Sequence, residues 1–315
     1  MDTDSLTLRH LSPVLGVEVR DFDLREPVSE PAVAAILAAL SEHLVLVFRE
    51  QILTPAQQIS FMGRLGHLAP SSPVIPGISR EHHQVKAVDG RRSDGRVSYW
   101  HSDITYMLEP PSATALFARV LPPSGGDTEF ASTVAAYEQL SAPLRGFVDT
   151  LHAFHDDAGL ASYLDVNGPG VWEDRLITDL PPVRHPVVVT NARSGRRGLF
   201  VNHAFTRAID GLGADESDAL LSLLLARLTR AENTVRIRWE PGTLVLSDNW
   251  STIHRGINDY GTATRILHKV SLRGARPTGS TYAGGPPTGR GAISPTWPDA
   301  GSPLRRVDPR RARVG

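Results

Sequence analysis

Two histidines and one carboxylate in this chain have the residue types and the spacing of a metal-binding set. His101 and Asp103 stand two residues apart within Tyr99–Asp103. Residues i and i+2 of an extended segment point to the same side, so both side chains can reach one ion. Much later come His254 and then Arg265. Two histidines and a carboxylate with open positions form the ligand set of non-haem iron(II) oxygenases, and an arginine suits an anionic co-substrate.

The His-x-Asp spacing by itself does not identify the site. With 12 histidines in the chain, chance predicts roughly one such pair, and the sequence contains a second one at His155 and Asp157. No strand-like run precedes His155, and the segment continues into Ala158 and Gly159, so we expect a solvated loop there. On local sequence alone, His254 is better explained as a histidine that caps or packs at a strand end.

The composition excludes several classes of site and partner. The chain has no cysteine, so any metal must be held by His, Asp or Glu, and disulfides and cysteine nucleophiles are ruled out. The net charge of −1 gives no general attraction to nucleic acid or to a membrane surface. The acidic N-terminus has no secretory signal pattern, and no apolar run approaches a membrane span. We therefore expect a cytoplasmic globular protein without nucleic-acid or membrane partners.

The elements that must position these residues are mostly strands, with helices between the early ones. Short strands are expected within residues 6–24, and the apolar run 44–48 is typical of a buried strand. A capped amphipathic helix should follow Ser29, and a second helix should begin after Thr54 and end at Gly66. Further strands are expected at 114–120, 234–239, 243–246 and 265–272, and further helices at 134–140 and from Asp215 onward. This order favours a two-sheet β-sandwich with outer helices over a parallel α/β sheet, which would need regular alternation.

Two segments differ from the rest of the chain. Residues 69–98 carry Pro, Gly, Ser and many charges, and we expect a long loop or lid there, where binding residues often lie. In residues 277–315, Gly and Pro make up 14 of 39 positions, and six Arg face two Asp. This composition predicts a disordered or loosely ordered tail. The expected organisation is one domain over 1–276, followed by the tail over 277–315.

At the His101 stretch the sequence also resembles the taurine dioxygenase (TauD/TfdA) family of Fe(II)/2-oxoglutarate-dependent dioxygenases. The resemblance covers roughly residues 6–275, with several matching stretches in the family's order. These stretches are Trp100–Tyr106, Pro110–Pro111, Leu121–Pro122, Gly125–Thr128, Leu199–His203, Ser247–Asn249, His254–Arg255 and Arg265–Lys269. The family implies a distorted double-stranded β-helix, a jelly-roll or cupin-like core, with helices outside it.

The resemblance implies a role for each matched residue of the site. His101, Asp103 and His254 would bind Fe(II), and Thr128 and Arg265 would hold the distal carboxylate of 2-oxoglutarate, the arginine as a charge-assisted fork. Dioxygen would be the other co-substrate. Succinate and carbon dioxide would be released while the substrate is hydroxylated or otherwise oxidised by hydrogen abstraction. Related halogenases have a small residue in place of Asp103, so the carboxylate favours oxygenation.

The substrate contacts of the family carry over less well. Sulfonate-cleaving members have a basic residue four positions after the arginine that binds 2-oxoglutarate, and it binds the substrate anion. Here that position is Lys269, which keeps the charge and loses the fork; a surface lysine on a strand is the alternative interpretation. The lid histidine, tyrosine and asparagine of the family align near Ser72, Ile75 and Val97, so that set is missing.

Other residues near these motifs are weaker candidates. Phe205 is expected to keep an aromatic wall of the substrate pocket. Tyr99, Tyr106 and His203 could also line it, although packing is at least as good an explanation for each of these three. Two further residues are expected behind the metal ligands, Trp100 as a packing residue and Asn249 to orient His254 or its loop.

Three functions remain open. The first is an oxygenase for a small anionic or amino-acid-like metabolite. The second is an alkyl-sulfate or sulfonate dioxygenase, which the changed lid disfavours and Lys269 keeps open. The third is a jelly-roll binding protein without redox activity, although such a protein has no need to keep the metal triad together with Thr128 and Arg265. Nucleic-acid demethylation would need a basic groove with stacking aromatic residues, and only 6% of the residues are aromatic. Because the family often forms dimers or tetramers, a homodimer or homotetramer is expected, with no indication of the interface.

Overall fold

The computed structural model describes residues 6–70, 77–89, 98–157, 170–172, 175–177 and 180–279. The chain divides into two compact units, residues 1–280 and residues 281–315. The second unit lies outside the described residues, so the tail remains a prediction. No helix in the described part of the chain has the length and apolar character needed to cross a membrane.

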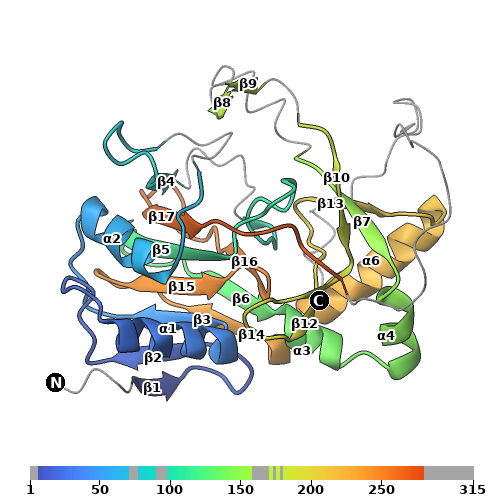
Figure 1. The fold of residues 1–315 in the computed structure, drawn as a ribbon, viewed down its shortest axis with the longest axis horizontal. Coiled ribbons are helices and arrows are strands. Elements are labelled where there is room, and N and C mark those ends of the chain that lie inside the picture. The colour runs from blue at the N-terminus through green and yellow to red at the C-terminus, as the bar shows by residue number, and fades with distance from the viewer. Residues whose placement is uncertain are drawn as a thin grey trace. The chain divides into compact units, whose positions relative to one another are not determined.

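The first unit consists mainly of strands, with helices packed at its edges (Figure 1). The helices are α1 (Glu30–His43), α2 (Pro55–Leu65), α3 (Thr133–Glu138), α4 (Ala142–Val148) and α6 (Ala214–Leu228). The strands of the first half are β1 (Thr7–His10), β2 (Val17–Arg20), β3 (Val45–Phe48), β4 (Lys86–Asp89), β5 (Ala113–Val120), β6 (Thr128–Ser132) and β7 (His152–His155). The later strands are β8 (Gly170–Trp172), β9 (Arg175–Ile177), β10 (Val183–Pro186), β11 (Val188–Thr190), β12 (Arg197–Leu199), β13 (Thr206–Ile209), β14 (Thr234–Ile237), β15 (Leu244–Asp248), β16 (Thr252–Gly256) and β17 (Ile266–Leu272).

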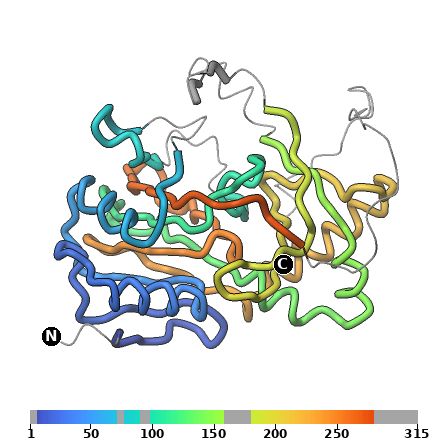
Figure 2. The backbone as a smooth tube through the Cα atoms, viewed as in Figure 1, coloured from blue at the N-terminus to red at the C-terminus, as the bar shows by residue number. Residues whose placement is uncertain are grey.

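Two facing sheets form the expected double-stranded β-helix. The larger sheet has the strand order β1-β2-β3-β15-β5-β17-β4, and the smaller has the order β14-β6-β16. Phe130 and Val235 of the smaller sheet pack in one buried cluster with Val47, Leu116 and Leu267 of the larger sheet. Figures 1 and 2 show β17, near the end of the described chain, beside β4 and β5, which come far earlier in the sequence. The core therefore joins the strands on which most candidate site residues lie.

The outer face of the larger sheet is covered by the first two helices. Val270 and Leu272 of β17 pack with Ile36 of α1 and Met62 of α2 in a second cluster. Because side chains alternate along a strand, Leu267, Lys269 and Ser271 of β17 point to the inner face.

The predicted start of α2 is confirmed, because the Thr54 hydroxyl accepts from the Gln57 amide at 3.2 Å, and the Gln57 side chain accepts from the Thr54 amide at 3.0 Å.

Two expectations from the sequence were wrong. His155 does not lie in a solvated loop: it ends β7, which pairs with β10 and β13, and its side chain is fully buried. Residues 69–98 are not loop throughout, because Lys86–Asp89 forms β4 at the edge of the larger sheet, where it pairs with β17. The three lid residues Ser72, Ile75 and Val97 lie outside the described residues.

Candidate metal centre

The structure brings together the side chains of His101, Asp103 and His254. The Nε2 atoms of the two imidazoles lie 3.9 and 4.0 Å from Asp103 Oδ1, and the three ligand atoms all lie within 4.8 Å of one another. An ion about 2.0–2.2 Å from each of two ligand atoms can join atoms up to about 4.4 Å apart, so the separations of 3.9 and 4.0 Å are within its reach. The residues present therefore fit a single metal ion, and all three residues are buried.

Backbone pairing fixes the two histidines beside each other. The His101 amide donates to the His254 carbonyl at 2.9 Å, and the His254 amide donates to the His101 carbonyl at 2.7 Å. His101 Nδ1 lies 2.7 Å from the Tyr99 carbonyl oxygen, which requires the proton on Nδ1 and leaves Nε2 free to bind a metal. Phe130 stacks on the His254 ring at 5.5 Å between centroids. Tyr99 is partly exposed, and it contacts the site through its backbone carbonyl, the partner of His101 Nδ1.

Asp103 is oriented by a polar clamp built from Asn249 and Thr114. The Asn249 side chain accepts from the Asp103 amide at 2.7 Å and donates to the carbonyls of Asp103 and Pro111 at 3.1 and 2.9 Å. The Thr114 hydroxyl donates to Asp103 Oδ2 at 2.9 Å, so Oδ1 faces the imidazoles. The clamp also holds Ile104 at a φ of 56°, a left-handed conformation that is unfavourable for a β-branched residue. Asn249 therefore orients Asp103, whereas the sequence had suggested that it orients His254 or its loop.

The electrostatics of the site suit a divalent cation. Burial alone would raise the pKa of the Asp103 carboxyl, but Lys269 and the two imidazoles outweigh it and hold that pKa well below its usual range. Burial, reinforced by His101, lowers the pKa of His254 to about 3, and burial also lowers the pKa of His101. At neutral pH the centre is thus one carboxylate with two neutral imidazoles, the protonation states in which these groups bind metal.

Arg265 and Thr128 form a second buried polar group. The buried Arg265 side chain donates to the Thr128 hydroxyl at 3.0 Å and to the Gly126 carbonyl at 2.6 Å. Trp239 Nε1 also donates to the Thr128 hydroxyl, at 3.0 Å. Within the described ranges no carboxylate forms an ion pair with Arg265, and burial lowers its pKa. A buried cation of this kind suits an anionic ligand. Trp239 was missed in the sequence, where it has no recognisable motif.

The Gly125-Gly126 turn is required by the approach of the arginine. Gly126 has a φ of 75°, and a Cβ atom there would lie 3.0 Å from Arg265 Cδ. Gly125 also has a φ of 75°, and a Cβ on it would lie 2.4 Å from the Asp259 carboxylate, which accepts from the Gly126 amide at 2.7 Å. Larger residues here would displace the segment that leads to Thr128.

Lys269 lies at the metal centre and is not a surface lysine. Its ammonium donates to Asp103 Oδ1 at 2.6 Å, and its side chain is buried. Phe205 forms an aromatic wall beside the centre, with its ring 6.1 Å from His101 and 4.9 Å from Tyr106. The candidates Lys269, Phe205 and Tyr106 are thus close to the ligands.

Two other sequence candidates lie behind or outside the centre. Trp100 is buried, its ring lies 5.0 Å from the Arg255 guanidinium, and its carbonyl accepts from the His203 amide at 3.1 Å. The His203 side chain itself is exposed.

Lys86 was not singled out in the sequence, because it lies in the expected lid. It is 4% exposed and pairs with Lys269 across β4 and β17.

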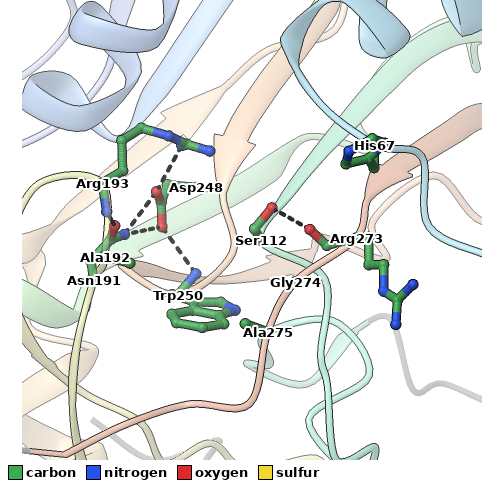
Figure 3. A pocket seen from close by; sticks show the side chains of 10 residues that line it. All are labelled: His67, Ser112, Asn191, Ala192, Arg193, Asp248, Trp250, Arg273, Gly274 and Ala275. Atoms are coloured by element: carbon green, nitrogen blue, oxygen red, sulfur yellow. Dashed lines mark hydrogen bonds and ion pairs between the residues drawn. The ribbon is translucent and has the colours of Figure 1, made fainter.

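A separate pocket of about 360 Å³ lies away from the metal ligands, none of which lines it (Figure 3). Asn191 donates to both oxygens of the Asp248 carboxylate at 2.9 Å, and Arg193 approaches the same carboxylate at 3.4 Å. Asp248 in turn accepts from the amides of Trp250 and Ser251. This network stabilises the turn that leads into β16, the strand on which His254 lies.

The comparisons with known proteins agree with this geometry. Residues 7–271 match the family model described as "Taurine catabolism dioxygenase TauD, TfdA family". The chain is 37% identical to an alpha-ketoglutarate-dependent sulfate ester dioxygenase of Pseudomonas putida, over 84% of this chain and 88% of that protein. It is 32% identical to an alkylsulfatase of Acinetobacter baylyi, over 88% of each chain. A taurine dioxygenase structure from Burkholderia xenovorans superimposes with a TM-score of 0.75 at 32% identity, covering 87% of this chain and 93% of that one.

Proposed function

Because this chain belongs to the TauD, TfdA family and is a 2-oxoglutarate-dependent dioxygenase, we propose that it uses Fe(II) to oxidise a small organic anion. Hydroxylation, or another oxidation that begins with hydrogen abstraction, would accompany release of succinate and carbon dioxide. The observation that supports an anionic substrate is the buried ammonium of Lys269, which lies 2.6 Å from Asp103 Oδ1. A buried cation on the inner face of the sheet favours a ligand of opposite charge.

His101, Asp103 and His254 would hold the metal through Nε2, Oδ1 and Nε2. Three protein ligands leave open positions, as in the facial triad of iron(II) oxygenases. Bound there, Fe(II) supplies the redox chemistry that couples dioxygen to the oxidative decarboxylation of 2-oxoglutarate. The clamp of Asn249 and Thr114 supports this assignment because it fixes both the backbone and one oxygen of Asp103. Such outer contacts orient metal ligands.

Arg265 and Thr128 would bind the distal carboxylate of 2-oxoglutarate. The Thr128 oxygen already accepts from Arg265 and Trp239, so its own proton remains to be donated. In the described part of the chain that proton has no acceptor. A carboxylate placed here would receive the hydroxyl proton and pair with the guanidinium, the kind of charge-assisted contact that is shorter and stronger than a neutral one.

Cleavage of an alkyl sulfate ester is the second candidate, favoured by the two relatives named for sulfate ester chemistry. Hydroxylation of the carbon that carries the sulfate group would give an unstable hydroxy ester. That product would lose hydrogen sulfate and leave an aldehyde. The proposal thus needs no hydrolytic nucleophile.

A two-stage experiment tests the proposal. Fe(II) and 2-oxoglutarate are added under anaerobic conditions, and the visible charge-transfer band of the complex is sought. Succinate is then measured in air with hexyl sulfate, hexanesulfonate, hexanoate and hexanol. We expect the band, a slow release of succinate without substrate, and a faster release with at least one anion. No band and no succinate under any condition would contradict the proposal, and stimulation by hexanol alone would contradict the anionic substrate.

A further inference from the structure

Lysine is confined to one place in this protein. Of the 33 lysine and arginine residues, 31 are arginines, and Lys86 and Lys269 are the only two lysines. They lie directly opposite each other in the antiparallel pair of β4 and β17, where facing side chains point to the same side and lie close together. Both are buried, with 4% and 8% of their surfaces exposed. Every exposed cationic side chain of the lysine and arginine type is therefore an arginine.

The pair faces the interior of the jelly roll. Val88 and Leu267 form the next pair on the same face of the two strands, and both pack in the cluster between the sheets. Lys269 extends from this face to Asp103. Lys86, as its cross-strand partner, points to the same side of the sheet as Lys269.

The two ammonium groups have unequal partners. Lys269 is hydrogen-bonded to the Asp103 carboxylate, whereas the structure as described gives Lys86 no hydrogen bond or ion pair. Burial lowers the pKa of Lys86 to about 8; Lys269, which repels the ammonium, acts in the same direction, and Asp103, which attracts it, acts in the opposite direction. Like charges directly opposite each other destabilise a sheet, and a buried charge without a partner is costly. One carboxylate thus faces two ammonium groups, and a further anion would balance them.

We propose that Lys86 determines the substrate specificity of this enzyme by binding the anionic group of the substrate next to Lys269. The proposal rests on the proposed function and adds the residue that selects the anion. An ammonium is a compact charge on a flexible stem, which can follow an oxyanion without a fixed fork geometry. With the anion held between the two lysines, the adjacent carbon lies toward Asp103 and the metal centre. The ligand is a small organic oxyanion, whose anionic group is a sulfate ester, a sulfonate or a carboxylate.

Substitution of Lys86 tests the proposal by kinetics. We expect Lys86→Met to raise the KM for the best of hexyl sulfate, hexanesulfonate and hexanoate by 10- to 100-fold, and to raise it by a larger factor than the KM for 2-oxoglutarate. Lys86→Arg should recover part of the loss. The matched control is Arg64→Met, which removes one charge from the exposed face of α2 and should change nothing. An unchanged KM in Lys86→Met would overturn the proposal.

The two lysines also permit a test that needs no turnover. Protein labelled with 13C at lysine Cε should give two side-chain resonances, assigned by their loss in Lys86→Met and Lys269→Met. With Zn(II) and 2-oxoglutarate bound, hexyl sulfate, hexanesulfonate or hexanoate should shift the Lys86 resonance, and hexanol should not. The anion that shifts the Lys86 resonance at the lowest concentration identifies which anionic group the site prefers.

The outcomes separate this proposal from the function on which it rests. If no anion shifts the Lys86 resonance although anions stimulate succinate release, Lys86 does not bind the substrate and the proposed function stands. If wild-type protein releases no succinate with Fe(II) and 2-oxoglutarate, the proposed function fails, whatever the lysine resonances show. A shift of the Lys86 resonance by hexanol equal to that by the anions would also overturn the proposal.

Discussion

The backbones of His101 and His254 hydrogen-bond to each other in both directions, at 2.9 and 2.7 Å. One histidine comes from the segment before β5 and the other from β16, so a single pair of backbone contacts brings distant parts of the chain together. Because these contacts do not involve the imidazoles, the two Nε2 atoms stay available for a metal. The centre is therefore preorganised by the sheet rather than by the side chains themselves.

Removal of one imidazole tests the metal assignment. We expect His254→Ala to lose metal binding and, with it, the anaerobic charge-transfer band and all succinate release, because two ligands remain where three are needed. Metal content after dialysis against Mn(II) gives a readout independent of activity. The control is His268→Ala on the outer face of β17, which should bind metal as wild type does. Retention of stoichiometric metal by His254→Ala would show that another residue completes the site.

Removal of the buried guanidinium tests the co-substrate assignment. Arg265→Ala should raise the KM for 2-oxoglutarate by about 10- to 100-fold, because a hydrogen bond to a charged group contributes about 1.5–3 kcal/mol. Arg236→Ala is a matched control: this arginine is half exposed and pairs with Asp127, so its loss should leave the KM unchanged. If the requirement for 2-oxoglutarate does not change in Arg265→Ala, the assignment is wrong.

Sequence patterns predicted the elements whose signals are local. The capping box at Thr54, the apolar run of β3 and the leucine stripe of α6 each follow from neighbouring residues. β4 could not be predicted in this way, since Lys86–Asp89 has one strongly apolar side chain and becomes a strand by pairing with β17. His155 was misjudged for the same reason, because its burial comes from pairing with β10 and β13.

Some residues of the candidate site could be predicted from the sequence, and others depend on strand pairing. His101, Asp103, His254 and Arg265 could be found from residue types and from the family resemblance, and the structure gathers the first three within 4.8 Å. The significance of Lys86 needed the register of β4 against β17. The count of two lysines is visible in the sequence, but only the pairing shows that they face each other.

The clamp on Asp103 can be tested by comparing two buried asparagines. Asn249→Ala removes three hydrogen bonds to the segment around Asp103, and we expect a loss of about 2–4 kcal/mol in the free energy of unfolding with a 10- to 100-fold weaker metal affinity. Asn191→Ala also removes buried hydrogen bonds, to Asp248 and Ser251, and should destabilise the protein without a comparable effect on the metal. Equal metal affinity in the two variants would show that the clamp has no role at the centre.

The buried ammonium of Lys86 should give stability and substrate binding a pH dependence of known sign. Burial, and after it Lys269, lower the pKa of Lys86 to about 8 from the ordinary lysine value of 10.5, while Asp103 acts in the opposite direction. Below pH 8 the group is charged in both the folded and the unfolded chain, so folding must bury a charge. Between about pH 8 and 10.5 the unfolded chain binds more protons at this residue than the folded chain, and the contribution of Lys86 to stability rises with pH.

Lys86→Met should therefore be more stable than wild type at pH 7, by at most about 3 kcal/mol, and this advantage should fade as the pH approaches 10.5. Urea denaturation of both proteins at pH 7, 8, 9 and 10 measures the difference. The KM of wild type for its anionic substrate should rise above pH 8 as the ammonium is lost, and the KM of Lys86→Met should not follow. An advantage in stability that stays constant from pH 7 to 10 would mean that Lys86 does not titrate in this range, and the pH dependence of substrate binding would then need another group.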